Sequence, residues 1–554
     1  RKDLYSKQKL EGDQETLRSF YADQGYFEFD IRSTNVTISP NKQDISLFIS
    51  LIEGPQYKTG KLDIIGADSL GIDTQSPLAL VKAGSVFSRK AISDVRKTIS
   101  DALSDKGFGN AVVNPVPNVN EAEQLVDVRF EVTAGPRLYV RRINILGNTI
   151  TQDDVIRREL RQLEGARFSA KDVRRSQERI QRLGHFEAVE IDTFPVPGVP
   201  DQVDLQVKVN ERASTGSINF AVGYADVEGV IYQLGYNQRN FLGTGRELSI
   251  KLDNSNVTDV YQISYTNPYY TVDGVSRSFY LNSTQVDSAR ADTAEYFSDS
   301  IEIGTGYRIP ISENNSVKFD VFAEKIDLES SKETPPEILT FIDKHSSNTN
   351  LGLRVSLAKD SLNDYIFPSA GSLASISLEA AAPGSDLEYY KVSLSGAKYF
   401  PLFGTDYAFK TKIKLGYGGA YGEEEDLPFY KNYYAGGPGS VRGFKSRSLG
   451  PLDTGNTPEP IGGDRRVLAN LELLMPAFGS VGSKDKRLTA FVDAGMVYGV
   501  GQKASSDSLR MSAGISLQWY SVIGPLTLSY AYPLNEEEAD KLQKFQISLG
   551  TLFR

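Results

Sequence analysis

Apolar and polar residues alternate with a period of two along most of the chain after residue 213. The pattern is clear in residues 217–224 and 230–236, and it returns in 409–417 and 526–532. Such alternation is typical of strands that bury one face, and this region shows scarcely any helical periodicity. About 340 residues, at roughly 20 per strand and connection, predict an antiparallel sheet of about 16 strands.

A sheet of this size can form a soluble sandwich or a membrane barrel. One face of the expected strands is crowded with aromatic residues, drawn from 29 Tyr and 27 Phe. The other face carries small polar residues and lysines such as Lys410, which suit a wet lumen better than a dry core. Connections alternate between short turns, as in 267–274, and long polar loops, as in 330–348. These features favour a transmembrane β-barrel over residues 213–554.

The first 212 residues contain an internal repeat instead. In each copy an amphipathic helix ends at a glycine, and an aromatic residue and a strand follow. These glycines are Gly25, Gly107 and Gly184, which are 82 and 77 residues apart. Repeats of this kind indicate tandem modules, here of β-α-α-β-β order. We expect the remainder of a module in 1–57, which lacks an opening strand and helix, and complete modules in 58–135 and 136–212.

The composition argues against several classes of function. The chain has no cysteine and only two histidines, His185 and His345, so thiolate metal sites and a Ser-His-Asp triad are improbable. His345 lies in a loop without a serine motif, which argues against a barrel enzyme such as a membrane phospholipase. The net charge of −10 gives no support for nucleic-acid binding. We expect no catalytic centre, no metal and no cofactor.

A glycine-rich segment near residues 432–450 surrounds one arginine. Arg442 is flanked by Val441, Gly443 and Phe444. An arginine keeps its charge and offers five donors, so a loop that folds inward needs carboxylate partners for it. The residues of the loop alone leave open a simpler reading, a surface turn with a solvated arginine.

Several motifs carry a resemblance to a known family. They are VRGF at Val441, FYKNYYAGG at Phe429, TNPYYTVDGVS at Thr266, GSDLEYYKVSL at Gly384 and MSAGISLQW at Met511. The chain resembles the BamA family, the barrel subunits of the bacterial outer-membrane β-barrel assembly machinery. The resemblance implies POTRA modules in the periplasm, of which the first here is the C-terminal part of the third of five. It also implies a sixteen-stranded barrel in the outer membrane and an inward-folding VRGF loop.

The resemblance suggests two partners for Arg442, namely Glu472 and Asp493. The alternation agrees, because Leu471 and Leu473 have the lipid-facing phase and Glu472 between them faces inward. Two lumen carboxylates and one guanidinium would form a charge-assisted latch. We expect Arg447, five residues further on, to be solvated.

Two further sites are expected. The first and last strands of the barrel should meet at a weak lateral seam, with Gly216, Phe220 and Gly223 on one side and Phe545, Gly550 and Phe553 on the other. Arg554 departs from the usual terminal aromatic residue. In the module 136–212, Glu164 matches the family position that contacts an accessory lipoprotein; a solvated loop acid is the alternative.

These features predict an insertase for outer-membrane barrel proteins. Its modules would capture unfolded clients by strand addition, and its seam would template their strands. Accessory lipoproteins and outer-membrane lipids are the other expected partners. The alternative is a pore of the two-partner secretion or TamA type.

Overall fold

The structure is a computed structural model that describes residues 6–549, apart from 41–44, 292, 313, 365–366, 403–406, 423–425, 456, 478–484, 500–501, 503–507 and 522–523. The chain forms two compact units, Arg1–Ala213 and Ser214–Arg554. No helix in the described residues is long and apolar enough to cross a membrane.

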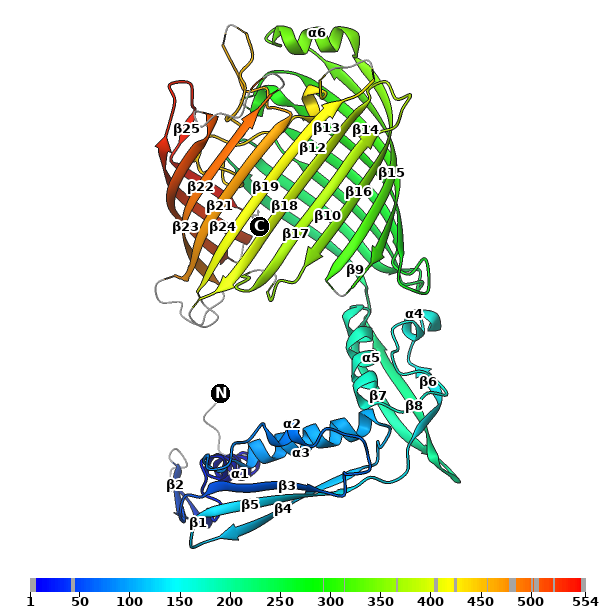
Figure 1. Ribbon diagram of the computed structural model, residues 1–554, viewed down its shortest axis with the longest axis vertical. Coiled ribbons are helices and arrows are strands. Elements are labelled where there is room, and N and C mark those ends of the chain that lie inside the picture. The colour runs from blue at the N-terminus through cyan, green and yellow to red at the C-terminus, as the bar shows by residue number, and fades with distance from the viewer. Residues whose placement is uncertain are drawn as a thin grey trace. The chain divides into compact units, whose positions relative to one another are not determined.

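The first unit consists of successive α+β modules (Figure 1). Its helices are α1 (Lys7–Asp23), α2 (Gln75–Leu78), α3 (Arg89–Asp105), α4 (Asp153–Arg157) and α5 (Ala170–Arg182). Its strands are β1 (Asp30–Ile38), β2 (Ile45–Ile52), β3 (Lys58–Ile65), β4 (Val112–Asn120), β5 (Leu125–Thr133), β6 (Tyr139–Leu146), β7 (Phe186–Val196) and β8 (Val199–Glu211). The sheets are ordered β1-β2, β3-β5-β4 and β6-β8-β7, so two modules have the predicted β-α-α-β-β order.

Helices α3 and α5 each begin at a serine cap that is supported by the preceding module. The Ser88 hydroxyl accepts from the Ala91 amide at 3.2 Å, and the Ser169 hydroxyl from the Asp172 amide at 3.2 Å. Asp23, at the end of α1, accepts from the Ser88 hydroxyl at 3.1 Å and from the Lys90 amide at 2.7 Å. A carboxylate at a helix N-terminus binds the unpaired amides there and complements the helix dipole. Asp105 repeats this arrangement with Ser169 and Lys171.

Glu211 closes the last module at the end of β8. Its carboxylate accepts from the amides of Thr149, Ile150 and Thr151 at 2.9, 2.9 and 2.7 Å. Burial alone would raise the pKa of Glu211, but these hydrogen bonds outweigh it and lower the pKa to about 2.

The second unit is a closed antiparallel barrel of sixteen strands, as the alternation predicted. In chain order these strands are β9 (Gly216–Ala225), β10 (Gly229–Phe241), β11 (Arg246–Asn254), β12 (Thr258–Asn267), β13 (Ser276–Asp287), β14 (Phe297–Pro310), β15 (Asn315–Glu329), β16 (Ser347–Asp360), β17 (Gly371–Ala381), β18 (Tyr389–Pro401), β19 (Ala408–Ala420), β21 (Arg465–Pro476), β22 (Lys486–Tyr498), β23 (Arg510–Ser521), β24 (Gly524–Asn535) and β26 (Phe545–Leu549). Two short strands, β20 (Gly443–Phe444) and β25 (Leu542–Gln543), pair with each other outside the barrel ladder.

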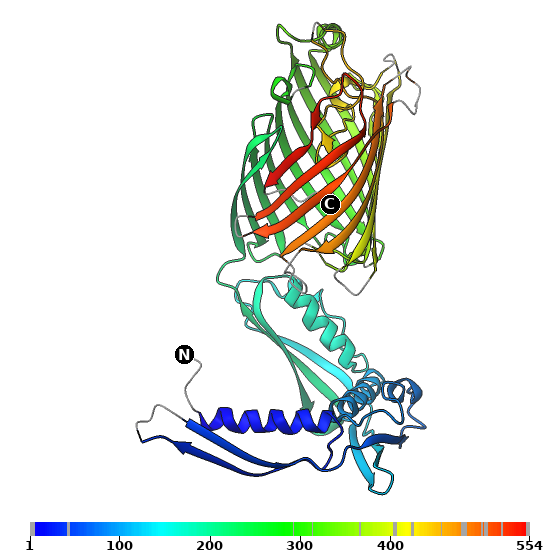
Figure 2. The same ribbon diagram turned by 90° about the vertical axis from the view of Figure 1, so that its left-hand side faces the viewer.

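The alternation of the sequence becomes the two faces of the barrel wall. In β15, Phe319 and Val321 are 40% and 49% exposed, whereas Asp320 and Phe322 are each 1% exposed. The exposed set faces lipid, and the buried set lines a lumen filled by side chains and by the inserted loop. The strands slant across the wall, as barrel closure requires (Figure 2).

The segment 330–348 corrects the expectation of a loop without regular structure. It contains helix α6 (Pro336–Lys344), which lies at one end of the barrel (Figure 1). Ile338 and Ile342 are buried on one side of α6 and pack in a cluster with Tyr296 and Phe429. Two 3-10 turns, η1 (Ser288–Ala291) and η2 (Phe429–Lys431), contribute to the same end of the barrel.

Candidate functional site

The glycine-rich loop folds into the barrel. Val441 and Phe444 are fully buried, in a cluster with Leu468 and Val497 of the barrel wall. Gly436 has a φ of +99°, and a Cβ there would lie 2.3 Å from the Lys445 carbonyl oxygen. The tight packing of the loop on itself therefore requires glycine at this position.

Arg442 meets both of the expected carboxylates. Its Nε and one terminal nitrogen donate to the two oxygens of Asp493 at 2.7 Å each. The same terminal nitrogen donates to Glu472 Oε1 at 2.8 Å, and the Arg442 amide donates to Asp493 at 3.1 Å. The Asp493 side chain is 0% exposed and that of Arg442 is 8% exposed. We call Arg442, Glu472 and Asp493 the Arg442 latch. It is a desolvated ionic cluster in which the two oxygens of Asp493 bind the guanidinium in bidentate geometry.

Three further residues complete the latch, and sequence reasoning missed their roles. Lys410 pairs with Glu472 at 2.9 Å, and Asn470 donates to Asp493 at 2.8 Å. The guanidinium also lies over the Phe491 ring, 3.4 Å from its centroid. The sequence held one sign of the role of Lys410, because the alternation gives it the same inward phase as Glu472. The structure adds that β19 and β21 pair Lys410 directly opposite Glu472.

A second buried cation holds the start of the loop and was not predicted. Lys431 Nζ donates to both Glu324 oxygens at 3.1 Å and to Glu379 at 3.4 Å. The two acids lie on β15 and β17, and Arg354 pairs with Glu379 at 2.9 Å. Ionic contacts thus attach the loop to the barrel wall both at Lys431 and at Arg442.

Arg447 is partly exposed, as expected, but it also has an ion-pair partner that the sequence did not reveal. It donates to Glu228 Oε1 at 2.9 Å, and its side chain is 39% exposed. Glu228 lies in the turn between β9 and β10, 219 residues away in the sequence. The loop therefore reaches the first hairpin of the barrel.

The structure brings only part of the expected seam together. Among the residues described, β26 meets β9 at two pairs, Ser548–Ala225 and Leu549–Tyr224. Gly223 lies at this junction, where a Cβ would approach the Leu549 carbonyl oxygen to 2.8 Å.

The remaining seam candidates that the structure describes, Phe545, Gly216 and Phe220, do not belong to these two pairs. Phe545 pairs with Tyr530 of β24 rather than with β9. Gly216 and Phe220 lie further along β9, where their partners in the ladder are Gln238 and Leu234 of β10. Gly550 and Phe553 are outside the described residues.

Glu164 lies in the connection between α4 and α5. Its carboxylate accepts from the Ile143 amide at 2.7 Å and pairs with Arg157 at 3.6 Å. Its side chain is still 47% exposed, so its charge remains available at the surface of the module.

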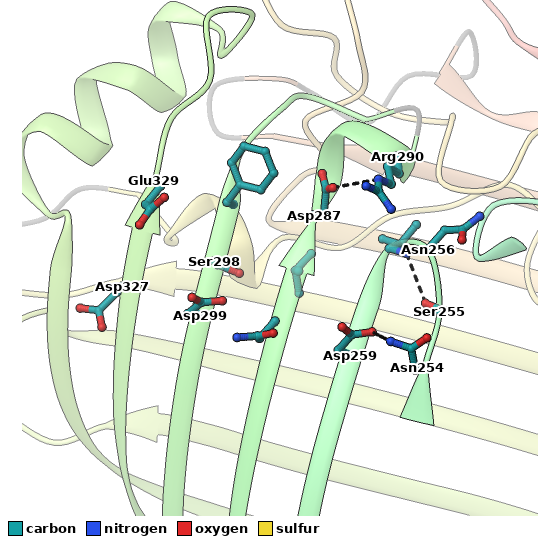
Figure 3. A pocket seen from close by; sticks show the side chains of 14 residues that line it. Asn254, Ser255, Asn256, Asp259, Asp287, Arg290, Ser298, Asp299, Asp327 and Glu329 are labelled. Atoms are coloured by element: carbon teal, nitrogen blue, oxygen red, sulfur yellow. Dashed lines mark hydrogen bonds and ion pairs between the residues drawn. The ribbon is translucent and has the colours of Figure 1, made fainter. Parts of the chain in front are cut away.

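A separate cavity of about 550 Å³ opens at the end of the barrel wall between β11 and β15 (Figure 3). Carboxylates from neighbouring strands line it in a row: Asp259, Asp287, Asp299, Asp327 and Glu329. Arg290 pairs with Asp287 at 3.0 Å. In the part of the chain that the structure describes, no group of three or more His, Asp or Glu side chains is arranged to hold a metal ion.

The architecture and the latch define a transmembrane barrel preceded by tandem modules and closed inside by a VRGF loop. The Omp85 superfamily domain matches residues 240–553. The POTRA repeat, described as a surface antigen variable number repeat, matches residues 1–54, 57–135 and 138–212.

Individual relatives agree with these domain matches. The outer membrane protein assembly factor BamA of Neisseria meningitidis serogroup B is 31% identical over 591 residues, which cover 100% of this chain and 74% of that protein. A sorting and assembly machinery component 50 homolog of Bos taurus is 26% identical, covering 75% of this chain and 90% of that protein. The crystal structure of Haemophilus ducreyi BamA lacking POTRA domains 1–3 is similar with a TM-score of 0.76 and 34% identity, covering 89% of this chain and 99% of that one.

The chain therefore belongs to the Omp85 superfamily and, within it, to the BamA family. Its barrel lies in the bacterial outer membrane, and its POTRA modules lie in the periplasm.

Proposed function

We propose that this protein folds and inserts β-barrel proteins into the bacterial outer membrane through the junction of β26 and β9, the seam. The observation that carries the proposal is that β26 and β9, the last and first strands of the barrel, pair with each other although no turn connects them. Relatives named as assembly factors support the same function, and a secretion pore is less supported. No chemical step is needed for such an activity.

The seam is the least costly place for the barrel to open. Lipid cannot replace broken strand hydrogen bonds, so each lost pair is expensive in the membrane. No turn connects β26 to β9, so these two strands can separate without straining a covalent connection. The exposed strand edge can then pair with a client strand.

A disulfide across the seam tests this route. Ala225→Cys with Ser548→Cys places two cysteines directly opposite each other, and the chain has no other cysteine. The matched control is Ala221→Cys with Gln233→Cys, an opposed pair on β9 and β10, which a turn already connects. We expect oxidation of the seam pair to stop client assembly, reduction to restore it, and the control to assemble clients in both states. Normal assembly with the seam locked would exclude opening at this junction.

We also propose that the outer edge of β7 captures unfolded clients. β7 and β4 each lie at one edge of a three-stranded sheet. In β4, Pro115 and Pro117 lie within an unbroken ladder with β5. Proline has no backbone N–H, so both prolines must occupy positions where that group would point away from β5. The outer edge of β4 therefore lacks two of the donors that an added strand would need. In β7 the Val189 carbonyl accepts from the Gln177 side chain at 2.7 Å, which places the odd-numbered backbone groups on the outer edge. There Ile191 and Thr193 keep their donors, and only Pro195, near the end of the strand, lacks one.

Thr193→Pro tests this capture, because it removes an outward donor of β7 without removing a donor to β8. We expect weaker cross-linking of an unfolded client peptide to the module 136–212 of the full-length protein, whereas Thr193→Ala binds normally. Equal cross-linking by both variants would contradict capture at this edge.

Accessory lipoproteins and outer-membrane lipids complete the proposed partners. The exposed charge of Glu164 supports a contact with an accessory lipoprotein at the α4–α5 connection. The apolar outer face of the barrel supports direct contact with lipid.

A further inference from the structure

The VRGF loop contacts the C-terminal side of the seam through its backbone. Gly443 pairs with Gln543, and Phe444 pairs with Leu542, in the small β20–β25 sheet. The Lys445 amide donates to the Lys541 carbonyl at 2.8 Å. Gln546, on β26 itself, donates from its side chain to the Phe444 carbonyl at 2.8 Å. The loop is thus hydrogen-bonded both to the last strand and to the segment that leads into it.

At Arg447, three residues after Phe444, the same loop contacts the N-terminal side of the seam. Arg447 pairs with Glu228 in the β9–β10 turn at 2.9 Å. The Ser255 hydroxyl donates to the other Glu228 oxygen at 3.0 Å, which fixes the orientation of the carboxylate. The Glu228 side chain is 24% exposed, so this ion pair is partly shielded from water. Glu228 is three residues from Ala225, one of the two β9 residues described in the seam ladder.

The backbone of Arg447 supports a specific role for this contact. Its φ is +60°, in the left-handed region that disfavours a long side chain. This backbone conformation is unfavourable for a residue with a Cβ unless its surroundings compensate. The bond to Glu228 is one compensating interaction, and it fixes the direction of the side chain across the seam.

A contact beside the loop joins the same two segments. Asp226, two residues before Glu228, lies close to the Ile547 backbone amide and the Gln543 side chain. Gln543 is also the partner of Gly443 in the β20–β25 sheet. The loop, the first turn and the last strand therefore meet at one point, close to the two described pairs of the seam ladder.

We propose that residues 442–447 form a strap across the inside of the seam, and that Arg447 and Glu228 are the positioning residues that keep this end of the seam closed. The Arg442 latch and the Phe444 pairing hold one end of the strap on the C-terminal side, and the Arg447–Glu228 pair holds the other end on the N-terminal side. Breaking this pair favours separation of β26 from β9. The strap bears on the proposed function only because seam opening is the proposed route of insertion.

Hydrogen exchange of the full-length protein in lipid nanodiscs, without any client, tests the strap. Arg447→Asn removes the charge but keeps a residue that tolerates the left-handed backbone, and Glu228→Gln removes the partner's charge. We expect both to raise amide exchange in 542–549 by about three- to tenfold, as for the loss of one partly shielded ion pair. The double variant Arg447→Glu with Glu228→Arg should return exchange toward the wild-type rate.

The matched control is Lys325→Asn, which breaks the exposed Lys325–Asp327 pair on β15, six strands away from β9 in the order of the barrel. It should leave exchange in 542–549 unchanged. Wild-type exchange in Arg447→Asn and Glu228→Gln, or an equal increase in the control, would overturn the strap. If amide exchange in 542–549 rises in Arg447→Asn and Glu228→Gln but both variants assemble clients at the normal rate, the strap is supported. That result would count against insertion through the seam.

Discussion

Removal of the Arg442 side chain should destabilise the barrel more than removal of any exposed arginine. Arg442→Ala deletes three charge-assisted hydrogen bonds, two to Asp493 at 2.7 Å and one to Glu472 at 2.8 Å. Asp493 is fully buried, so water cannot replace the lost donors. An uncompensated buried charge is the main cause of the expected loss.

The size of the loss follows from what the two acids retain. Glu472 keeps Lys410 at 2.9 Å, and Asp493 keeps Asn470 at 2.8 Å and the Arg442 amide at 3.1 Å. Breaking a buried pair typically costs about 3–5 kcal/mol, and these remaining bonds place Arg442→Ala near the lower end, at about 3 kcal/mol. Arg442→Lys should lie between wild type and Arg442→Ala, because an ammonium cannot reproduce the bidentate fork.

The temperature at which unboiled protein loses its folded gel mobility measures this order. The matched control is Arg290→Ala, whose ion pair has side chains 64% and 28% exposed and should contribute at most about 1 kcal/mol. Asp493→Asn should restore part of the stability in the Arg442→Ala background, although it destabilises the wild type. Equal losses for Arg442→Ala and Arg290→Ala, or strictly additive effects with Asp493→Asn, would refute the latch.

Three other outcomes are expected. Lys431→Met should destabilise the barrel by about 3 kcal/mol on the same gels because it leaves Glu324 and Glu379 without their shared cation, whereas Lys325→Met, with an exposed pair to Asp327, should have little effect. Glu164→Gln should weaken co-purification of an accessory lipoprotein while the helix signal in circular dichroism is kept, and Glu178→Gln on α5 should change neither; unchanged co-purification would leave Glu164 as an internal hydrogen-bond acceptor alone. Because the pKa of Glu211 is lowered, its carboxylate stabilises the module fully above pH 4.5 and loses this effect as the pH falls toward 2. Glu211→Gln should therefore lower the free energy of unfolding by about 2 kcal/mol at pH 7. It should also make the unfolding of the helices, followed by circular dichroism, less dependent on acid pH.

The barrel could be predicted from the sequence because alternation reports directly which residues share a face. Sixteen strands and the inward phase of Glu472 and Asp493 follow from that periodicity, and the family resemblance added the pairing with Arg442. Helix α6 was missed because it is a short amphipathic segment, Pro336–Lys344, within a long polar connection. Its apolar residues pack on η1 and η2 neighbours that only the closed barrel brings near.

The alternation of the sequence could not predict the contacts of the loop, for a different reason. Alternation fixes whether a strand residue faces lipid or lumen, but a loop has no phase, and its reach around the barrel depends on closure. Lys431 meets Glu324 and Glu379 from 107 and 52 residues away, and Arg447 meets Glu228 from 219 residues away. The neighbours of Arg447 in the sequence are polar, so they give no sign of a partner for it. Its partner lies in the first turn of the barrel, which comes near only when the last strand closes against β9. The same closure that hides this ion pair from the sequence makes it a link between the two ends of the barrel.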